Sequence, residues 1–236
     1  QKNLLRELAK LSKPMVIVLM SGRPMTIEEE NELPASILQV WHPGIEAGNA
    51  IAEVIYGEYN PSGKLTATWP RNVGQIPIYH STKFTGRPAP KENNYQKFKS
   101  NYLDVDNSPL FPFGYGLSYT SFEYKNLRLD KKKVESDESV EVSVDVSNTG
   151  EFDGEETVQL YLRDVVRTIT PPKRQLKGFK KVYLKKGETR TVQITLHADD
   201  LKFYNSELQH VAEPGNFEVF VGTDSNASLK ADFELE

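Results

Sequence analysis

SILQVWHPGIEAGNAIAEVIYGEYNPSGKLTATWP, residues 36–70, is the segment around which the rest of this chain is organised. It begins with a short apolar run, residues 36–41, of the kind found in a strand covered on both faces. After a Pro-Gly turn, apolar residues recur at helical spacing from Ala47 to Ile55, and Gly57 follows as a residue type that commonly ends a helix. Turn residues then lead into residues 65–69, which we expect to form a second strand. The order strand, helix, strand predicts a parallel sheet with a right-handed crossover.

The residues before this stretch continue the same α/β pattern. Residues 1–11 place leucines on one face of an amphipathic helix, and residues 25–33 fit a short acidic crossover helix. Residues 15–20 (MVIVLM) contain no polar side chain and predict a central strand buried on both faces. Three parallel strands that leave such a strand at an edge form an incomplete sheet. We therefore expect residues 1–120 to be the C-terminal part of an α/β domain whose first half lies upstream.

Two irregular segments follow the α/β pattern. Residues 71–107 lose all periodicity, and a loop of this length is usually functional or mobile. Residues 110–120 (LFPFGYGLSYT) are rich in aromatics and glycine and should bridge two domains. The aromatic side chains expected to be largely buried at this bridge are Phe111, Phe113, Tyr115 and Tyr119.

The period of the apolar pattern changes to two beyond Ser121. Turn residues separate seven candidate strands, at residues 122–129, 140–146, 158–162, 176–184, 192–196, 217–221 and 229–235. Seven short alternating strands predict an immunoglobulin-like β-sandwich over residues 121–236. Within it, Asp199 and Asp200 are interpreted as the cap of a short helix at residues 201–204.

A family resemblance rests on these motifs. Residues 41–70 resemble the signature of the α/β sandwich domain of glycoside hydrolase family three, the β-glucosidase family. Further matches follow in collinear order: KPMVIVLMSGRP (13–24), QIPIYHSTKFTGRP (75–88), PLFPFGYGLSYTSFEY (109–124), QLKGFKKVYLKKGETRTV (175–192) and EPGNFEVFVG (213–222). The chain is most similar to the periplasmic bacterial β-glucosidases. The resemblance implies the C-terminal part of the α/β sandwich domain followed by a fibronectin type III-like domain.

The resemblance also implies an activity for the full-length protein. That activity is retaining hydrolysis of terminal β-D-glucosyl residues from oligosaccharides or aryl glycosides, in the periplasm or outside the cell, without a cofactor. In the family the nucleophile is an Asp on an N-terminal barrel, and the acid/base is a Glu upstream of the segment matching Gln1. Glu46, Glu53 and Glu58 match neither position, so no residue here is assigned a catalytic role. We expect this chain alone to be inactive. Other specificities, such as β-xylosidase, and a non-catalytic carbohydrate-binding or scaffolding role remain open alternatives.

The candidate substrate-binding residue is Arg87. It lies in residues 79–102, where aromatics mix with Lys83, Arg87, Lys91 and Lys97, a composition that suits a polar binding rim or a solvated loop. Trp41 and Trp69 end expected strands at their carboxyl side, where α/β sheets bind ligands. They could stack on a sugar, but core packing is the favoured interpretation.

Composition and spacing argue against several other functions. A net charge of −4 gives no reason to expect nucleic acid, and no apolar run is long enough to span a membrane. The four histidines are far apart, the chain has no cysteine, and residues 104–107 lack the glycine and glutamate of a calcium loop, so no metal site is predicted. Gly44 and Gly48 favour close packing over phosphate binding, because their spacing fits no phosphate-binding motif. An exposed sheet edge beside residues 15–20 leaves homo-oligomer formation open.

Overall fold

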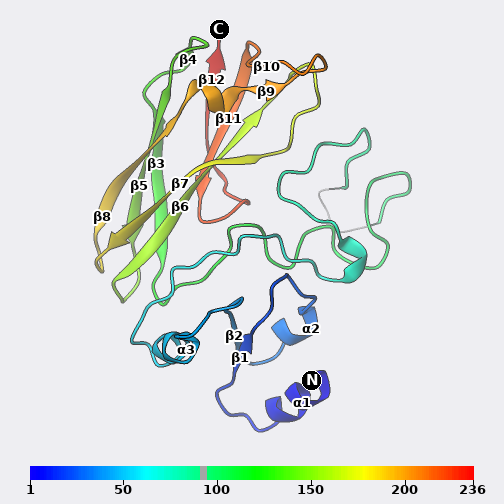
Figure 1. The fold of residues 1–236 in the computed structure, drawn as a ribbon, viewed down its shortest axis with the longest axis vertical. Helices are drawn as coiled ribbons and strands as arrows, with labels where there is room; N and C mark the ends of the chain where they lie inside the picture. The colour runs from blue at the N-terminus through cyan, green and yellow to red at the C-terminus, as the bar shows by residue number, and fades with distance from the viewer. Residues whose placement is uncertain (91–94) are drawn as a thin grey trace.

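The computed structural model describes residues 1–90 and 95–236. The chain forms an α/β part at its N-terminal end and a β-sandwich at its C-terminal end, arranged one above the other (Figure 1). The elements of the α/β part are α1 (Lys2–Ala9), β1 (Val16–Leu19), α2 (Glu28–Asn31), β2 (Ser36–Gln39), α3 (Ala47–Ile55) and the 3₁₀ turn η1 (Val73–Gln75). None of the helices in the described ranges has the length and apolar character that a membrane crossing requires.

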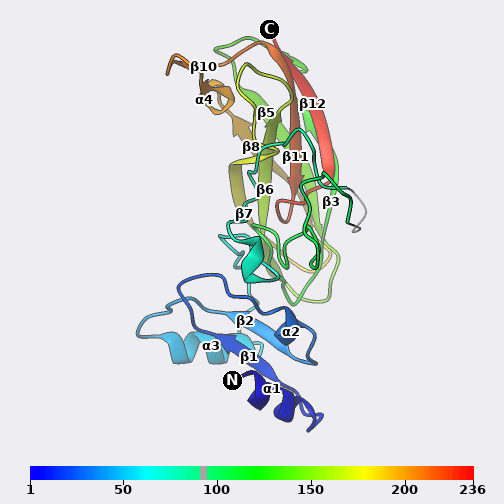
Figure 2. The ribbon, with the colours of Figure 1, turned by 90° about the vertical axis from the view of Figure 1, so that its right-hand side faces the viewer.

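The α/β part contains a parallel pair of strands, β1 and β2, in register from Val16 opposite Ser36 to Leu19 opposite Gln39. The helices α1, α2 and α3 lie around this pair (Figure 2). Gly57 has φ of +81°, so it ends α3 as the sequence predicts. The expectation that both strands are buried on both faces is wrong for this chain. Ile17 is the one fully buried residue of the two strands, because a two-stranded sheet gives each strand a single neighbour.

Residues 65–69 do not form the predicted third parallel strand. Their backbone instead pairs in an antiparallel direction with the linker before the sandwich, residues 110–120. Leu65 N–H donates to Tyr115 O (2.7 Å) and Trp69 N–H donates to Phe111 O (2.9 Å). The linker satisfies the backbone groups that a parallel neighbour would have used. The strand–helix pattern is therefore correct up to α3 and wrong beyond it.

The β-sandwich contains all seven strands that the alternating pattern predicts. One sheet has the order β3 (Phe122–Leu129), β5 (Val140–Asn148), β8 (Thr189–Leu196). The other has the order β4 (Lys133–Val134), β12 (Leu229–Leu235), β11 (Gly215–Gly222), β6 (Gly154–Asp164), β7 (Gln175–Leu184). Valine, leucine and phenylalanine side chains from both sheets form one core, which includes Val142, Val146, Leu160, Phe217 and Leu235.

Short elements of the sandwich differ from the pattern that the sequence predicts. The strand β4 and the hairpin strands β9 (Phe203–Tyr204) and β10 (His210–Val211) have two residues each, too few to show alternation. The short helix α4 is Ala198–Leu201, which corrects the expected range of 201–204. His197 is its N-cap, and the carboxylate of Asp200 accepts the His197 backbone N–H at 2.9 Å.

A third layer covers the outer face of the five-stranded sheet. Gln159 and Tyr161 on β6 point away from the sandwich core, where alternation predicts solvent, yet both are buried. The ring of Tyr161 packs with Phe220 and Phe113, and Gln159 donates to Gly114 O at 3.0 Å. Residues 71–107 and the linker therefore lie against the sandwich. Apart from η1, the described part of residues 71–107 is irregular, as expected.

The linker aromatics agree in part with the expected burial. Phe111, Phe113 and Tyr115 are half-buried, and the rings of Phe111 and Tyr115 stack at 5.0 Å. Tyr119 is exposed, although its hydroxyl donates to Val54 O in α3 (2.5 Å). The linker therefore contacts both the α/β part and the sandwich.

Candidate functional site

The carboxyl ends of β1 and β2 form the edge at which an α/β sheet binds ligands. After β1 the chain turns at Ser21, whose hydroxyl donates to Arg23 O (2.9 Å). After β2, Trp41 has a left-handed φ of +51°. The two turns touch, because a Cβ on Gly22 would lie 2.8 Å from His42 Nε2. A side chain at position 22 would therefore push the two turns apart.

The two tryptophans belong to an aromatic row that runs from this edge toward the linker. Trp41 meets Trp69 edge to face at 6.5 Å, and Trp69 meets Phe111 in the same way at 6.5 Å. Trp69 is 1% exposed, so it cannot offer a ring face to a sugar. The core-packing interpretation is confirmed for Trp69, and Trp41 is half-buried against it.

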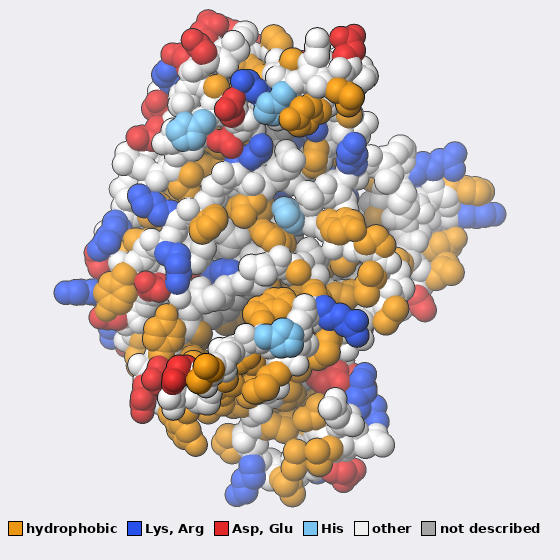
Figure 3. Space-filling model, viewed as in Figure 1, with side chains coloured by type: hydrophobic (Ala, Val, Ile, Leu, Met, Phe, Trp, Pro, Cys, Tyr) orange, Lys and Arg blue, Asp and Glu red, His pale blue; other side chains and the backbone are white. Residues whose placement is uncertain are grey.

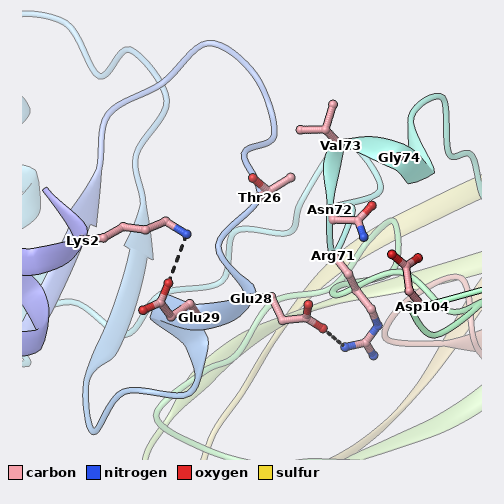
Figure 4. A pocket seen from close by; sticks show the side chains of 9 residues that line it. All are labelled: Lys2, Thr26, Glu28, Glu29, Arg71, Asn72, Val73, Gly74 and Asp104. Atoms are coloured by element: carbon pink, nitrogen blue, oxygen red, sulfur yellow. Dashed lines mark hydrogen bonds and ion pairs between the residues drawn. The ribbon is translucent and has the colours of Figure 1, made fainter.

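A polar hollow of about 600 Å³ lies between α1, α2 and η1 (Figure 4). Its lining residues are Lys2, Thr26, Glu28, Glu29, Arg71, Asn72, Val73, Gly74 and Asp104. Four of its charged groups form ion pairs: Lys2 contacts Glu29 (3.3 Å), and Arg71 contacts Glu28 (2.9 Å). A hydrogen bond from Arg6 holds the pKa of Glu29 below its ordinary value.

The chemistry of this hollow does not fit glycoside hydrolysis. A retaining glycosidase needs an ionised nucleophile about 5 Å from an acid/base whose pKa is raised. Glu28 and Glu29 instead lie in ion pairs with Arg71 and Arg6, and the hydrogen bond from Arg6 lowers the pKa of Glu29. We therefore assign no catalytic role to the hollow.

A carboxyl group with a raised pKa lies far along the chain, on β6 of the sandwich. Burial raises the pKa of Asp164, while Arg167, 4.0 Å away, opposes the shift. The guanidinium of Arg167 lies 4.3 Å from the ring centre of Phe203, so this pair is packed into the sandwich. Asp164 and Arg167 therefore form a structural ion pair of the sandwich.

The structure does not bring the candidate glutamates of the sequence together into a catalytic site. Glu46, Glu53 and Glu58 are exposed, and within the described ranges none of them forms an ion pair. Glu46 accepts a hydrogen bond from Asn49 at 2.7 Å. Across the residues the structure describes, no group of three His, Asp or Glu side chains could hold a metal ion.

Arg87 lies on an exposed loop tip. Its guanidinium is 5.9 Å from the ring centre of Phe98, over which Lys97 also lies at 4.9 Å. Figure 3 shows Lys, Arg and hydrophobic side chains together on the projection at the right of the view. Lys91, part of the same basic composition, lies outside the described residues. Substrate binding by Arg87 stays a prediction.

The residues that join the α/β part to the sandwich had no signal in the sequence. Lys64 Nζ lies 3.2 Å from Glu156 Oε2, with side chains 11% and 2% exposed, and donates to Gly116 O (3.0 Å). The hydroxyl of Tyr124 donates to Glu156 Oε1 (2.7 Å), and burial raises the Tyr124 pKa well above its ordinary value. Asn60 donates to Asp153 O (2.9 Å). These contacts fix how the two parts meet.

This combination of a two-stranded α/β part and a β-sandwich matches two known domain families. Residues 1–119 match the glycosyl hydrolase family 3 C-terminal domain, and residues 156–225 match a fibronectin type III-like domain. The chain belongs to glycosyl hydrolase family 3.

Individual relatives agree with this assignment. The chain is 46% identical over its full length to the periplasmic beta-glucosidase of Salmonella typhimurium, and 42% identical over 96% of its length to a beta-xylosidase of Formosa agariphila. The crystal structure of a beta-glucosidase from Listeria innocua in complex with isofagomine superposes with a TM-score of 0.93, at 41% identity over 99% of this chain. The chain spans only 31%, 30% and 32% of these three proteins.

Proposed function

We propose that this chain is the C-terminal part of a retaining β-glucosidase that removes terminal β-D-glucosyl residues from oligosaccharides or aryl glycosides. The observation that carries the proposal is the 46% identity to a periplasmic beta-glucosidase along all 236 residues. We assign residues 1–120 to the α/β sandwich domain and residues 121–236 to the fibronectin type III-like domain. By the same relationship we place the full-length protein in the periplasm or outside the cell.

In this proposal the catalytic carboxylates belong to parts of the enzyme outside this chain. The chemistry requires two carboxyl groups about 5 Å apart with opposite pKa shifts. Glu28 and Glu29 of the polar hollow are held in ion pairs, and Glu46, Glu53 and Glu58 are exposed to water. An N-terminal barrel supplying the nucleophile is the partner that the proposal requires. The proposal also includes self-association of the chain into a homo-oligomer.

Arg87 is proposed to contact the sugar at the rim of the site in the full-length enzyme. Its guanidinium is exposed and lies near the Phe98 ring, and a guanidinium can donate hydrogen bonds to sugar hydroxyl groups. Arg87→Ala in the full-length enzyme should raise KM more than it lowers kcat, because it removes binding shared by substrate and transition state. Lys99→Ala, in the same loop, is the matched control. Unchanged kinetics for Arg87→Ala would remove this residue from the site.

A second candidate activity is β-xylosidase, favoured by the 42% identity to the beta-xylosidase of Formosa agariphila. Assaying the full-length protein against matched aryl β-glucoside and aryl β-xyloside substrates decides between them by the ratio of kcat/KM values. A non-catalytic carbohydrate-binding module would instead bind oligosaccharide and turn over neither substrate. Absence of a barrel in the coding sequence upstream of Gln1 would contradict the enzyme proposal.

A further inference from the structure

The loop that carries Arg87 begins at an anchor on the sandwich. The ring of Phe84 lies between two cations, with Arg163 of β6 at 4.9 Å and Lys173 at 5.6 Å from its centre. The backbone beside it pairs with the β6–β7 connection, where Lys173 N–H donates to Thr82 O at 2.8 Å. These contacts fasten the start of the loop to the sandwich by both side chain and backbone.

A second contact lies four residues earlier. The imidazole of His80 stacks on Phe113 at 4.2 Å and meets the edge of Tyr161 at 5.9 Å. Tyr161 is fully buried on β6, an inner strand of the five-stranded sheet, so His80 rests on the outer face of that sheet. Phe84 and His80 together hold the approach to the loop flat against the outer face of the sandwich.

The other end of the loop is anchored near the α/β part. Gln75 is 1% exposed, and its amide donates to Asp106 O (2.8 Å) and Ser108 O (3.2 Å). Its side-chain oxygen accepts the Arg71 backbone N–H (2.6 Å), and Tyr102 donates to Gln75 O (3.4 Å). Residues 102–108 are therefore fixed independently of the sandwich anchor.

Between the two anchors, the described residues of the tip bond only to one another. Ser100 N–H donates to Arg87 O (2.8 Å), and the hydroxyls of Thr85 and Ser100 are 3.1 Å apart. Among residues 85–90 and 95–101, no hydrogen bond reaches the sandwich or the α/β part. The place of Arg87 thus depends on the two anchors.

We propose that the fibronectin type III-like sandwich is the support that positions the Arg87 loop, with Phe84 and His80 as its positioning residues. The sandwich then acts on the sugar site of the neighbouring domain by holding the loop that faces it. That last step rests on the proposed contact between Arg87 and sugar, whereas the anchoring itself does not.

The anchoring can be measured on the 236-residue chain. The chain has no cysteine, so nitroxide labels at Lys97→Cys and Thr195→Cys report the distance from the loop to β8 without further changes. Phe84→Ala should widen that distance distribution. It should also speed hydrogen exchange of the Lys173 amide about five- to thirtyfold, the effect of losing two cation–π contacts on local opening. Phe84 is 43% exposed, so truncation spares the sandwich core.

Two further variants make the test specific. Phe179→Ala removes an exposed phenylalanine of β7 that makes none of these contacts and should change neither measurement. Phe84→Tyr keeps a ring between the cations and should restore both. An unchanged distribution and exchange rate in Phe84→Ala, or an equal change in Phe179→Ala, would overturn the proposal.

Kinetics of the full-length enzyme separate this proposal from the one on which it rests. Phe84→Ala should raise KM and leave kcat nearly unchanged, as expected when a binding loop is misplaced. A wider distance distribution with unchanged KM would leave the anchoring in place and contradict the sugar contact of Arg87.

Discussion

The buried ion pair between Lys64 and Glu156 gives the sharpest test of how the two parts of the chain are joined. Lys64→Met removes the ammonium but keeps a side chain of similar length. It leaves the carboxylate of Glu156 in a site where its side chain is 2% exposed, with the Tyr124 hydroxyl as its remaining hydrogen-bond partner. A buried charge that loses its partner carries an uncompensated desolvation cost.

The expected loss follows from this burial. Breaking a buried pair on one side typically costs about 3–5 kcal/mol of the free energy of unfolding. The matched control is Lys181→Met, which breaks the pair of Lys181 with Glu155 (3.1 Å). That pair is 50% and 38% exposed, so its removal should cost about 0–1 kcal/mol. Both variants remove a lysine charge that pairs with a glutamate of β6, Glu156 for Lys64 and Glu155 for Lys181.

Urea unfolding with two optical probes measures both the size and the place of the effect. The only tryptophans, Trp41 and Trp69, lie outside the sandwich, so their fluorescence reports the α/β part, while far-ultraviolet circular dichroism is dominated by the sandwich strands. Lys64→Met should lower the fluorescence midpoint and separate the two transitions. Adding Glu156→Gln should recover part of the loss, because a neutral amide is cheaper to bury than an unpaired carboxylate. A loss no larger than that of Lys181→Met would refute the role of the pair.

Three other outcomes are expected. The purified chain should show no turnover of an aryl β-glucoside at high protein concentration, and turnover that tracks the protein would contradict the absence of a catalytic pair. Gly116→Ala should destabilise the chain by about 1–3 kcal/mol, since its Cβ would overlap Gly63 O, whereas Gly63→Ala has open space and should be nearly neutral in thermal unfolding. Burial against Phe113 and Tyr161 lowers the pKa of His80, and burial keeps Tyr161 neutral by raising its own pKa. The unfolded chain therefore takes up a proton first as pH falls below about 6.5, so stability should be lost from there down to the lowered pKa, and His80→Phe should show a shallower loss in urea titrations.

The β-sandwich is predictable from the sequence, because its signal is local and repeated. Each of its seven long strands alternates apolar and polar residues, and alternation states directly which face of a strand is buried. The sequence also predicts the helices α1 and α3 and the end of α3 at Gly57, because these signals are local as well. The helices follow from the helical spacing of apolar residues, and the end of α3 follows from a glycine that can adopt a left-handed conformation. Of the candidate site, the sequence supplied Arg87 and a basic, aromatic loop, but not what holds them.

The contacts between the parts could not be predicted from the sequence. Residues 65–69 have the composition of a strand, yet their backbone pairs with linker residues 42 to 50 positions later (Trp69 with Phe111, Leu65 with Tyr115). Which segment pairs with them depends on the tertiary fold and not on their own composition. Gln159 and Tyr161 read as solvent-facing because alternation cannot reveal that a distant loop covers them. Lys64 and Glu156 look like surface charges until the two parts meet and exclude water around them. Local periodicity fixes the elements, whereas burial of a polar group is a property of its neighbours in space.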